Sequence, residues 1–93
     1  MKTLTRQEAY RIIDTERDYQ EKLWGDMNKE IHNPSSFILW MEEYLSKARS
    51  LASTMDERQG TNGNREIMEM IRKVTALGVA CIEINGAPER ETK

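Results

Sequence analysis

Apolar residues recur at steps of three and four positions along three stretches of the chain, with polar residues between them. This spacing places side chains on one face of an α-helix, which turns once in about 3.6 residues. It predicts helices over about residues 5–23, 34–56 and 64–85. The stripe expected to face the core in the first helix consists of Ala9, Ile12, Ile13, Tyr19 (or Gln20) and Leu23. We therefore expect an all-α fold, a three-helix antiparallel hairpin or bundle, in a single domain that spans residues 1–93.

Local signals mark where these helices begin. Thr5 and Glu8 have the spacing of a capping box, in which the Thr5 hydroxyl accepts the Glu8 backbone N–H and the carboxylate reaches back. Asn33 is a good capping residue for the second helix, and Pro34 suits its first position. Residues 56–64 contain two glycines and predict the turn between the second and third helices.

The third helix changes character along its length. Residues 65–73 are amphipathic, whereas residues 74–84 are apolar nearly all round. A chain this short has little core to cover such a segment, which predicts a homo-oligomer that assembles through the apolar third helix. The alternative is a central core helix, with small residues such as Gly78 where neighbouring helices cross. The charged tail, residues 87–93, is expected to fray.

Composition narrows the class of protein. Fourteen Lys plus Arg against sixteen Asp plus Glu leave a net charge of −2, which gives no global field for a nucleic acid polymer or an acidic membrane. No apolar run reaches the roughly 18 residues of a membrane span, and the N-terminus lacks the apolar core of a signal peptide. We therefore expect a cytoplasmic protein. One Cys and one His argue against a disulfide framework and a zinc site.

Carboxylates on the second and third helices raise the question of a metal site, because hard cations in helical bundles bind inward carboxylates. The residues concerned are Glu42, Glu43, Glu66 and Glu69. Helix three has an acidic pair three residues apart, but Ser46 stands where Glu43 needs its partner. The alternative is a solvated face with ordinary ion pairs at i,i+4, such as Glu43 with Lys47 and Glu69 with Lys73.

Cations, aromatic rings and hydroxyl groups near helix ends favour an anionic, base-containing ligand. Arg and Lys bind phosphate, rings stack on bases, and donors at a helix N-terminus bind anions. The candidate ligand-binding residues are Tyr19, Trp24, His32, Ser35, Ser36, Arg72 and Lys73. Each has a simpler alternative: a solvated surface for the cations, an exposed or structural His32, and helix capping for the serines.

One segment is similar to a known family. Residues 16–25, Glu-Arg-Asp-Tyr-Gln-Glu-Lys-Leu-Trp-Gly, resemble the opening of small phage-encoded MazG-like proteins, where an ERxxQxxxWG-type helix end precedes a His-containing loop. Residues 37–48 and 72–83 look like the two following helices, and residues 83–90 look like the close of such proteins. The resemblance covers roughly residues 12–90.

The resemblance implies an all-α relative of the nucleotide pyrophosphohydrolases, helical oligomers in which an ExxE pair and a second acidic pair hold Mg²⁺. Carried over, the first Glu falls on Glu43 and its partner on Ser46. Glu69 matches an acid, while the expected Asp falls near Arg72 or Lys73. Half of the metal cage is thus replaced, and the resemblance implies a nucleotide-shaped pocket without a cofactor. Mg²⁺ is expected only if Glu43 and Glu69 still serve a hydrolase.

These observations predict a non-catalytic, phage-type protein that binds a nucleotide, such as a sponge that sequesters a cyclic (di)nucleotide immune signal in the host cytoplasm as an anti-defence measure. Its expected partners are that ligand and further copies of itself, with no nucleic acid polymer and no membrane. One alternative is a Mg²⁺-dependent nucleoside triphosphate pyrophosphohydrolase of the MazG type. The other is a helical interaction module that inhibits a host factor.

Overall fold

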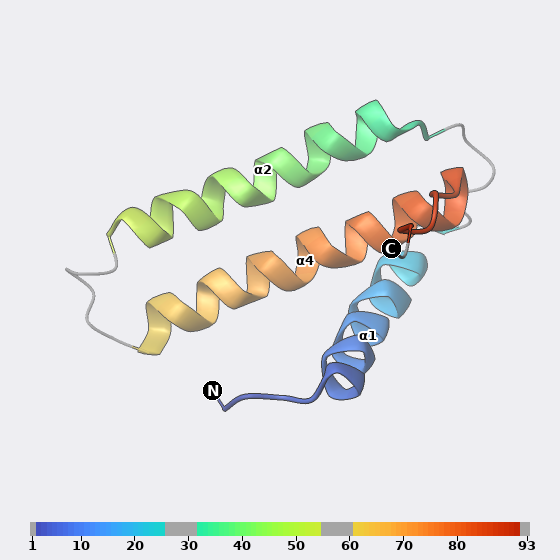
Figure 1. Cartoon of the computed structure of the whole chain (residues 1–93). Coiled ribbons are helices and arrows are strands. Elements are labelled where there is room, and N and C mark those ends of the chain that lie inside the picture. The colour runs from blue at the N-terminus through green and yellow to red at the C-terminus, as the bar shows by residue number, and fades with distance from the viewer. Residues whose placement is uncertain (1, 26–31, 55–60, 92–93) are drawn as a thin grey trace.

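The computed structural model describes residues 2–25, 32–54 and 61–91, and within these ranges the chain forms three α-helices and no strand. They are α1 (Arg6–Trp24), α2 (Pro34–Ser53) and α4 (Thr61–Asn85). Helices α2 and α4 run antiparallel, side by side, and α1 crosses them at a steep angle near the C-terminal half of α4 (Figure 1). The prediction of an all-α, three-helix fold is confirmed.

The capping signals act as the sequence predicts. The Thr5 hydroxyl accepts a hydrogen bond of 3.2 Å from the Glu8 backbone N–H, and the Thr5 N–H donates to the Glu8 carboxylate at 2.9 Å. These hydrogen bonds with the backbone and side chain of Thr5 also lower the pKa of Glu8 below its usual value, because they favour the ionised carboxylate. At the start of α2, the Asn33 side chain accepts from the Ser36 N–H at 3.0 Å.

The predicted boundaries need one correction. The third helix begins at Thr61 and not at residue 64, so Thr61, Asn62 and Gly63 are helical where we expected a turn. Glycine and asparagine are weak helix formers, but adding a residue to an existing long helix is favourable, and α4 is 25 residues long. The predicted end of the second helix at residues 55–56, and most of the expected turn, lie outside the described residues.

The core lies between α2 and α4. Phe37 on α2 is fully buried against Leu77 and Ala80 on α4. Four partly buried side chains surround this centre: Met41, Tyr44, Cys81 and Ile84. The small residues Ala76 and Ala80 have no exposed area, so they are core residues at helix contacts, as the alternative interpretation of the third helix proposed.

Helix α1 attaches to α4 in a different way, through polar side chains. Its buried residues are Glu16, Arg17 and Gln20. The apolar stripe predicted for this helix is therefore wrong in part: Tyr19 and Leu23 are 58% and 61% exposed. The pattern offered Tyr19 or Gln20 for the core, and Gln20 is the buried one. Polar residues take the inner face because α4 supplies partners of opposite charge there. Among the described helices, none is long and apolar enough to cross a membrane.

Candidate functional site

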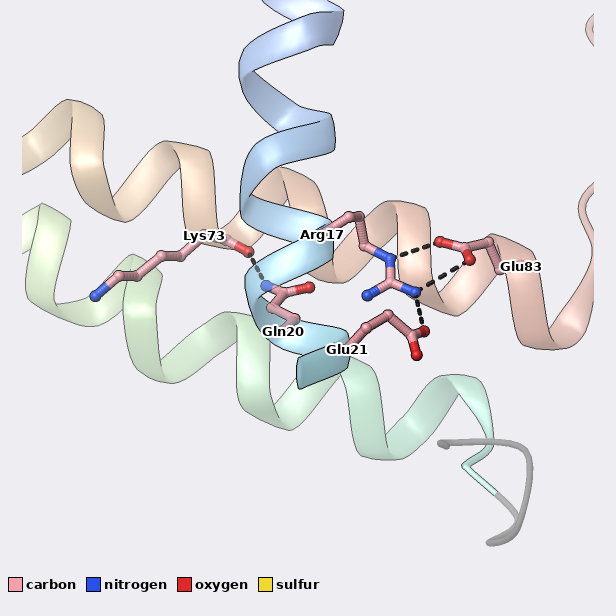
Figure 2. A network of polar contacts seen from close by, with 5 residues as sticks. All are labelled: Arg17, Gln20, Glu21, Lys73 and Glu83. Atoms are coloured by element: carbon pink, nitrogen blue, oxygen red, sulfur yellow. Dashed lines mark hydrogen bonds and ion pairs between the residues drawn. The ribbon is translucent and has the colours of Figure 1, made fainter. Parts of the chain in front are cut away.

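Two ion pairs and an amide hydrogen bond join α1 to α4, and Figure 2 shows the Arg17–Glu83 pair and the amide hydrogen bond. Arg17 donates from Nε and Nη2 to the two carboxylate oxygens of Glu83, at 2.6 and 3.0 Å, and its Nη2 also donates to Glu21 on the same helix. The Gln20 amide donates to the Lys73 backbone carbonyl at 3.5 Å. Because two N–H groups bind two oxygens in parallel, the Arg17–Glu83 pair fixes the angle at which α1 crosses α4.

The second ion pair involves a residue that the sequence assigned to ligand binding. Arg72 donates from Nε to the Glu16 carboxylate at 2.7 Å, and the Glu16 side chain is only 8% exposed. If Arg72 turned to bind a phosphate, it would leave a buried carboxylate without its partner, which costs several kcal/mol. We infer from this geometry that Arg72 holds α1 in place, with its Nε bound to the Glu16 carboxylate.

Acid should weaken the α1–α4 contact in a defined pH range. The Arg17 hydrogen bonds hold the pKa of Glu83 below its ordinary value of 4.5, and Glu83 in turn raises the pKa of Arg17. A lowered folded-state pKa means that Glu83 stabilises the fold fully above 4.5, and that this contribution is lost as the pH falls through the folded pKa. Urea unfolding at several pH values measures this.

We expect the stability difference between the wild type and Glu83→Gln to be constant near neutral pH and to shrink below about pH 4.5. The glutamine variant has no titrating group at this position, which makes it the matched control. An equal difference at about pH 3 and about pH 7 would contradict a carboxylate that is ionised because of Arg17.

Lys73 directly follows Arg72 on α4, but its side chain leaves the ion pairs and its ammonium group is directed toward α2. Its Nζ is 5.5 Å from the centre of the Tyr44 ring, and the Nζ of Lys47 is 5.3 Å from the same centre. Both distances fit a cation–π contact. The expected ion pairs of these lysines with Glu43 and Glu69 are not formed. The Glu69 carboxylate lies 3.9 Å from the Nε of Arg65 instead. Within the described residues, the two ammonium groups therefore have no carboxylate partner.

An aromatic cluster lies where the C-terminal end of α1 meets the N-terminal end of α2. The rings of Trp24 and Trp40 have their centres 6.5 Å apart and are inclined by 32°. His32 and Phe37 meet Trp40 edge-on, at 5.3 and 5.1 Å. The His32 carbonyl accepts a hydrogen bond of 3.1 Å from the Asn85 amide, which ties this corner to the end of α4. The sequence predicts Trp24 and His32 as ligand residues, and the structure places both of their rings beside Trp40.

The rings and the lysines belong to one side of the molecule. Trp40, Tyr44 and Lys47 follow each other on α2 at steps of four and three, so they share a helix face. Trp24 of α1 borders this face at one end, and Lys73 of α4 borders it beside Tyr44. We call the five residues Trp24, Trp40, Tyr44, Lys47 and Lys73 the indole–lysine surface. Three of them were not among the predicted ligand residues, although their spacing on α2 was visible in the sequence.

The remaining predicted ligand residues lie elsewhere. Tyr19 is exposed in a shallow depression on α1, together with Asp18, Glu21 and Lys22, on a different helix face from the buried Gln20. The Ser36 hydroxyl donates to Asn33 at 3.3 Å and its N–H is capped by the same side chain, so it takes part in helix capping. Ser35 is exposed at the first turn of α2.

The carboxylates of the hydrolase alternative are not gathered into a cage by the described part of the chain. Glu43 is exposed on α2, and Glu69 is partly buried on α4 beside Arg65. Across residues 2–25, 32–54 and 61–91, no group of three or more His, Cys, Asp or Glu side chains is placed to hold a metal ion. The structure thus offers no observation that favours Glu43 and Glu69 as magnesium ligands.

Comparison with known proteins supplies no relative from which a function can be transferred. No family model, no curated protein and no solved structure matches the chain. The indole–lysine surface and the helices that hold it are therefore the features of this protein that bear on its function.

Proposed function

We propose that this protein binds a nucleotide, without hydrolysing it, on the indole–lysine surface. One observation carries the proposal: two partly exposed indoles and two lysines without carboxylate partners among the described residues share one side of the molecule. A base and a phosphate are the two chemical groups that such an arrangement attracts, one by stacking and one by charge.

The indoles supply a platform for a base. Trp24 and Trp40 are 42% and 37% exposed, although tryptophan is the side chain with the largest apolar area to bury. Stacking a base on an aromatic side chain contributes about 1–3 kcal/mol. A planar ligand would cover this exposed ring area, and the edge-on contacts from His32 and Phe37 already hold the Trp40 ring in a fixed orientation.

The lysines supply charge at a suitable distance from that platform. Lys47 follows Trp40 by two helical turns, a rise of about 10 Å. This is comparable to the reach of a nucleotide from its base to its outer phosphates. The Tyr44 ring lies beside both ammonium groups, so the lysine side chains are ordered before a ligand arrives and lose less entropy when it binds.

The same chemistry fits the sponge that the sequence predicts. A sponge for a cyclic (di)nucleotide signal needs tight binding and no reaction, and it works in the cytoplasm of the host if the protein is phage-encoded. We also propose that the protein is a homo-oligomer, because it leaves many large apolar side chains exposed, among them Leu39 and Ile82 at 66% and 55%. Two copies would present two platforms and two pairs of lysines.

Titration calorimetry on the full chain tests the binding proposal. The probes are ATP, AMP, cyclic AMP, cyclic dinucleotides and cyclic ADP-ribose isomers, each with and without Mg²⁺. We expect a micromolar dissociation constant for at least one of them, weaker binding as salt is raised, and unchanged ligand in the recovered sample. Absence of binding to every probe at tens of micromolar would overturn the proposal. Release of pyrophosphate from a nucleoside triphosphate would replace it with the hydrolase alternative.

A further inference from the structure

Helix α1 covers only one side of the α2–α4 pair, and the opposite side is apolar. Around Leu77, which is buried against α2, the preceding residue Ala76 is also fully buried, whereas the following residue Gly78 is only half-buried. Successive residues are rotated by about 100° around a helix. Arg72 and Glu83, which bind α1, lie on the Ala76 side of α4, so Gly78 lies on the side away from α1.

The same rotation places the matching residues of α2. Phe37 is buried against α4, and Ile38 follows it by one position. Because two antiparallel helices side by side turn in mirrored directions when viewed along one axis, Ile38 and Gly78 lie on the same side of the pair. Trp40 supports this assignment. It is rotated from Phe37 in the opposite sense to Ile38, and it contacts Trp24 of α1.

We call this side the outer face. It consists of Ile38 and Leu45 on α2, and Ile67, Ile71, Gly78 and Ile82 on α4. Four of its side chains are well exposed: Ile38 at 50%, Leu45 at 48%, Ile71 at 40% and Ile82 at 55%. A row of large apolar residues along two neighbouring helices is the surface that helices use to pack against a further layer.

Gly78 is not explained by contacts within the described chain. It lies inside a 25-residue helix, where glycine costs about 1 kcal/mol relative to alanine. It does not have a positive φ, and a Cβ added to it would meet no atom within 4 Å. An empty position among exposed isoleucines gives room for a side chain from another molecule.

Two exposed charges at the edge of the outer face indicate that the other molecule is a second copy of this chain. Glu42 and Arg49 lie seven residues apart on α2, on either side of Leu45, and neither forms an ion pair with a described residue. Opposite charges at equal distances from a midpoint are complementary to the same helix turned around by a two-fold axis. The Glu42 of one copy then faces the Arg49 of the other, twice.

We propose that the outer face binds a second copy of this chain, in a dimer with a two-fold axis that passes close to Leu45. This axis runs across both helices, in the plane where the two copies touch. Since Tyr44 lies beside Lys73, the axis crosses α4 near Arg72 and Lys73. Gly78 and Ile67 are equally far from that point along α4. Ile67 of one copy therefore fills the space left by Gly78 of the other.

The available area is sufficient for such a dimer. Helix α2 has 20 residues and is about 30 Å long, and two adjacent helices are about 20 Å wide. Their outer face therefore covers about 600 Å², close to the roughly 600–1,000 Å² that each partner buries in a stable interface. The dimer leaves the indole–lysine surface open, because that surface lies on the α1 side.

Charge reversal tests the proposed symmetry by sedimentation equilibrium on the full chain. We expect Glu42→Arg and Arg49→Glu each to raise the dimer dissociation constant at least about tenfold, because like charges then face each other twice. Mixing the two variants in equal amounts is expected to restore dimers, since every Arg then faces a Glu. Gly78→Leu is expected to weaken the dimer as well, while helix content measured by circular dichroism is kept.

Glu43→Arg is the matched control, since it changes charge by the same amount at an exposed neighbour that is rotated away from the outer face. A dimer that is insensitive to Glu42→Arg and Arg49→Glu would overturn this face and leave the proposed homo-oligomer standing. A wild-type protein that stays monomeric at every concentration would overturn both, whereas nucleotide binding by that monomer would leave the proposed ligand site intact.

Discussion

The Glu83→Ala variant is expected to lose about 2–3 kcal/mol of the free energy of unfolding. The substitution removes a half-exposed carboxylate but leaves the Arg17 guanidinium, whose side chain is 8% exposed, without its bidentate partner. Breaking a fully buried pair costs about 3–5 kcal/mol, and the expected loss is smaller because Glu83 is 50% exposed and Glu21 still binds Arg17. Urea unfolding followed by circular dichroism at neutral pH measures it.

Two further variants test whether the loss of stability in Glu83→Ala comes from the broken ion pair. Asp18→Ala, at an exposed position of the same helix, should stay within about 0.5 kcal/mol of the wild type. Replacing both partners, Arg17→Leu with Glu83→Leu, should recover most of the loss, because no charge is then left buried alone. If Glu83→Ala were as stable as the wild type, α1 would not be docked on α4 through Arg17.

Reversing both lysines of the indole–lysine surface is expected to weaken nucleotide binding roughly a hundredfold, about tenfold for each reversed charge. The variant is Lys47→Glu with Lys73→Glu. Each substitution replaces an ammonium group that would attract a phosphate with a carboxylate that repels it. Both side chains lie beside the Tyr44 ring and not in the apolar core, so the helices should form as before. Calorimetry with the nucleotide that binds the wild type best gives the change.

The control for this variant must carry the same net charge. Arg6→Glu with Arg11→Glu meets that condition, since both residues are exposed and precede Trp24 on α1 by 18 and 13 residues, which is about 20 Å or more along the helix. We expect the control to bind within about threefold of the wild type, because charges farther than a Debye length of about 8 Å are largely screened at physiological salt. Equal losses in the two variants would show that only overall charge matters, and would remove the lysines from the proposed site.

The helices were predictable because their signals are local. Periodic apolar positions and the caps at Thr5 and Asn33 act within a few residues, and these features appear in the structure as predicted. The inner face of α1 was not predictable in the same way. Glu16 and Arg17 read as solvent-exposed polar residues, yet each is buried by a partner 56 or 66 positions away in the sequence.

Long-range pairing also explains which parts of the candidate site could not be read from the chain. Arg72 has the charge of a phosphate ligand, but its Nε binds the carboxylate of Glu16, which lies 56 positions earlier in the sequence. Lys47 was paired with Glu43 by the usual i,i+4 rule, but its ammonium group lies by Tyr44. The sequence shows which residues share a helix face, whereas the neighbours that each face meets depend on how the helices cross.

The position of the tryptophans has a practical consequence. The chain contains two, and both belong to the corner where α1 and α2 meet, with their ring centres 6.5 Å apart. Ultraviolet emission excited at the tryptophan absorption edge thus originates entirely from this corner. The unlabelled protein carries its own optical reporter, which a stacked base would quench and which separation of α1 from α2 would shift in wavelength.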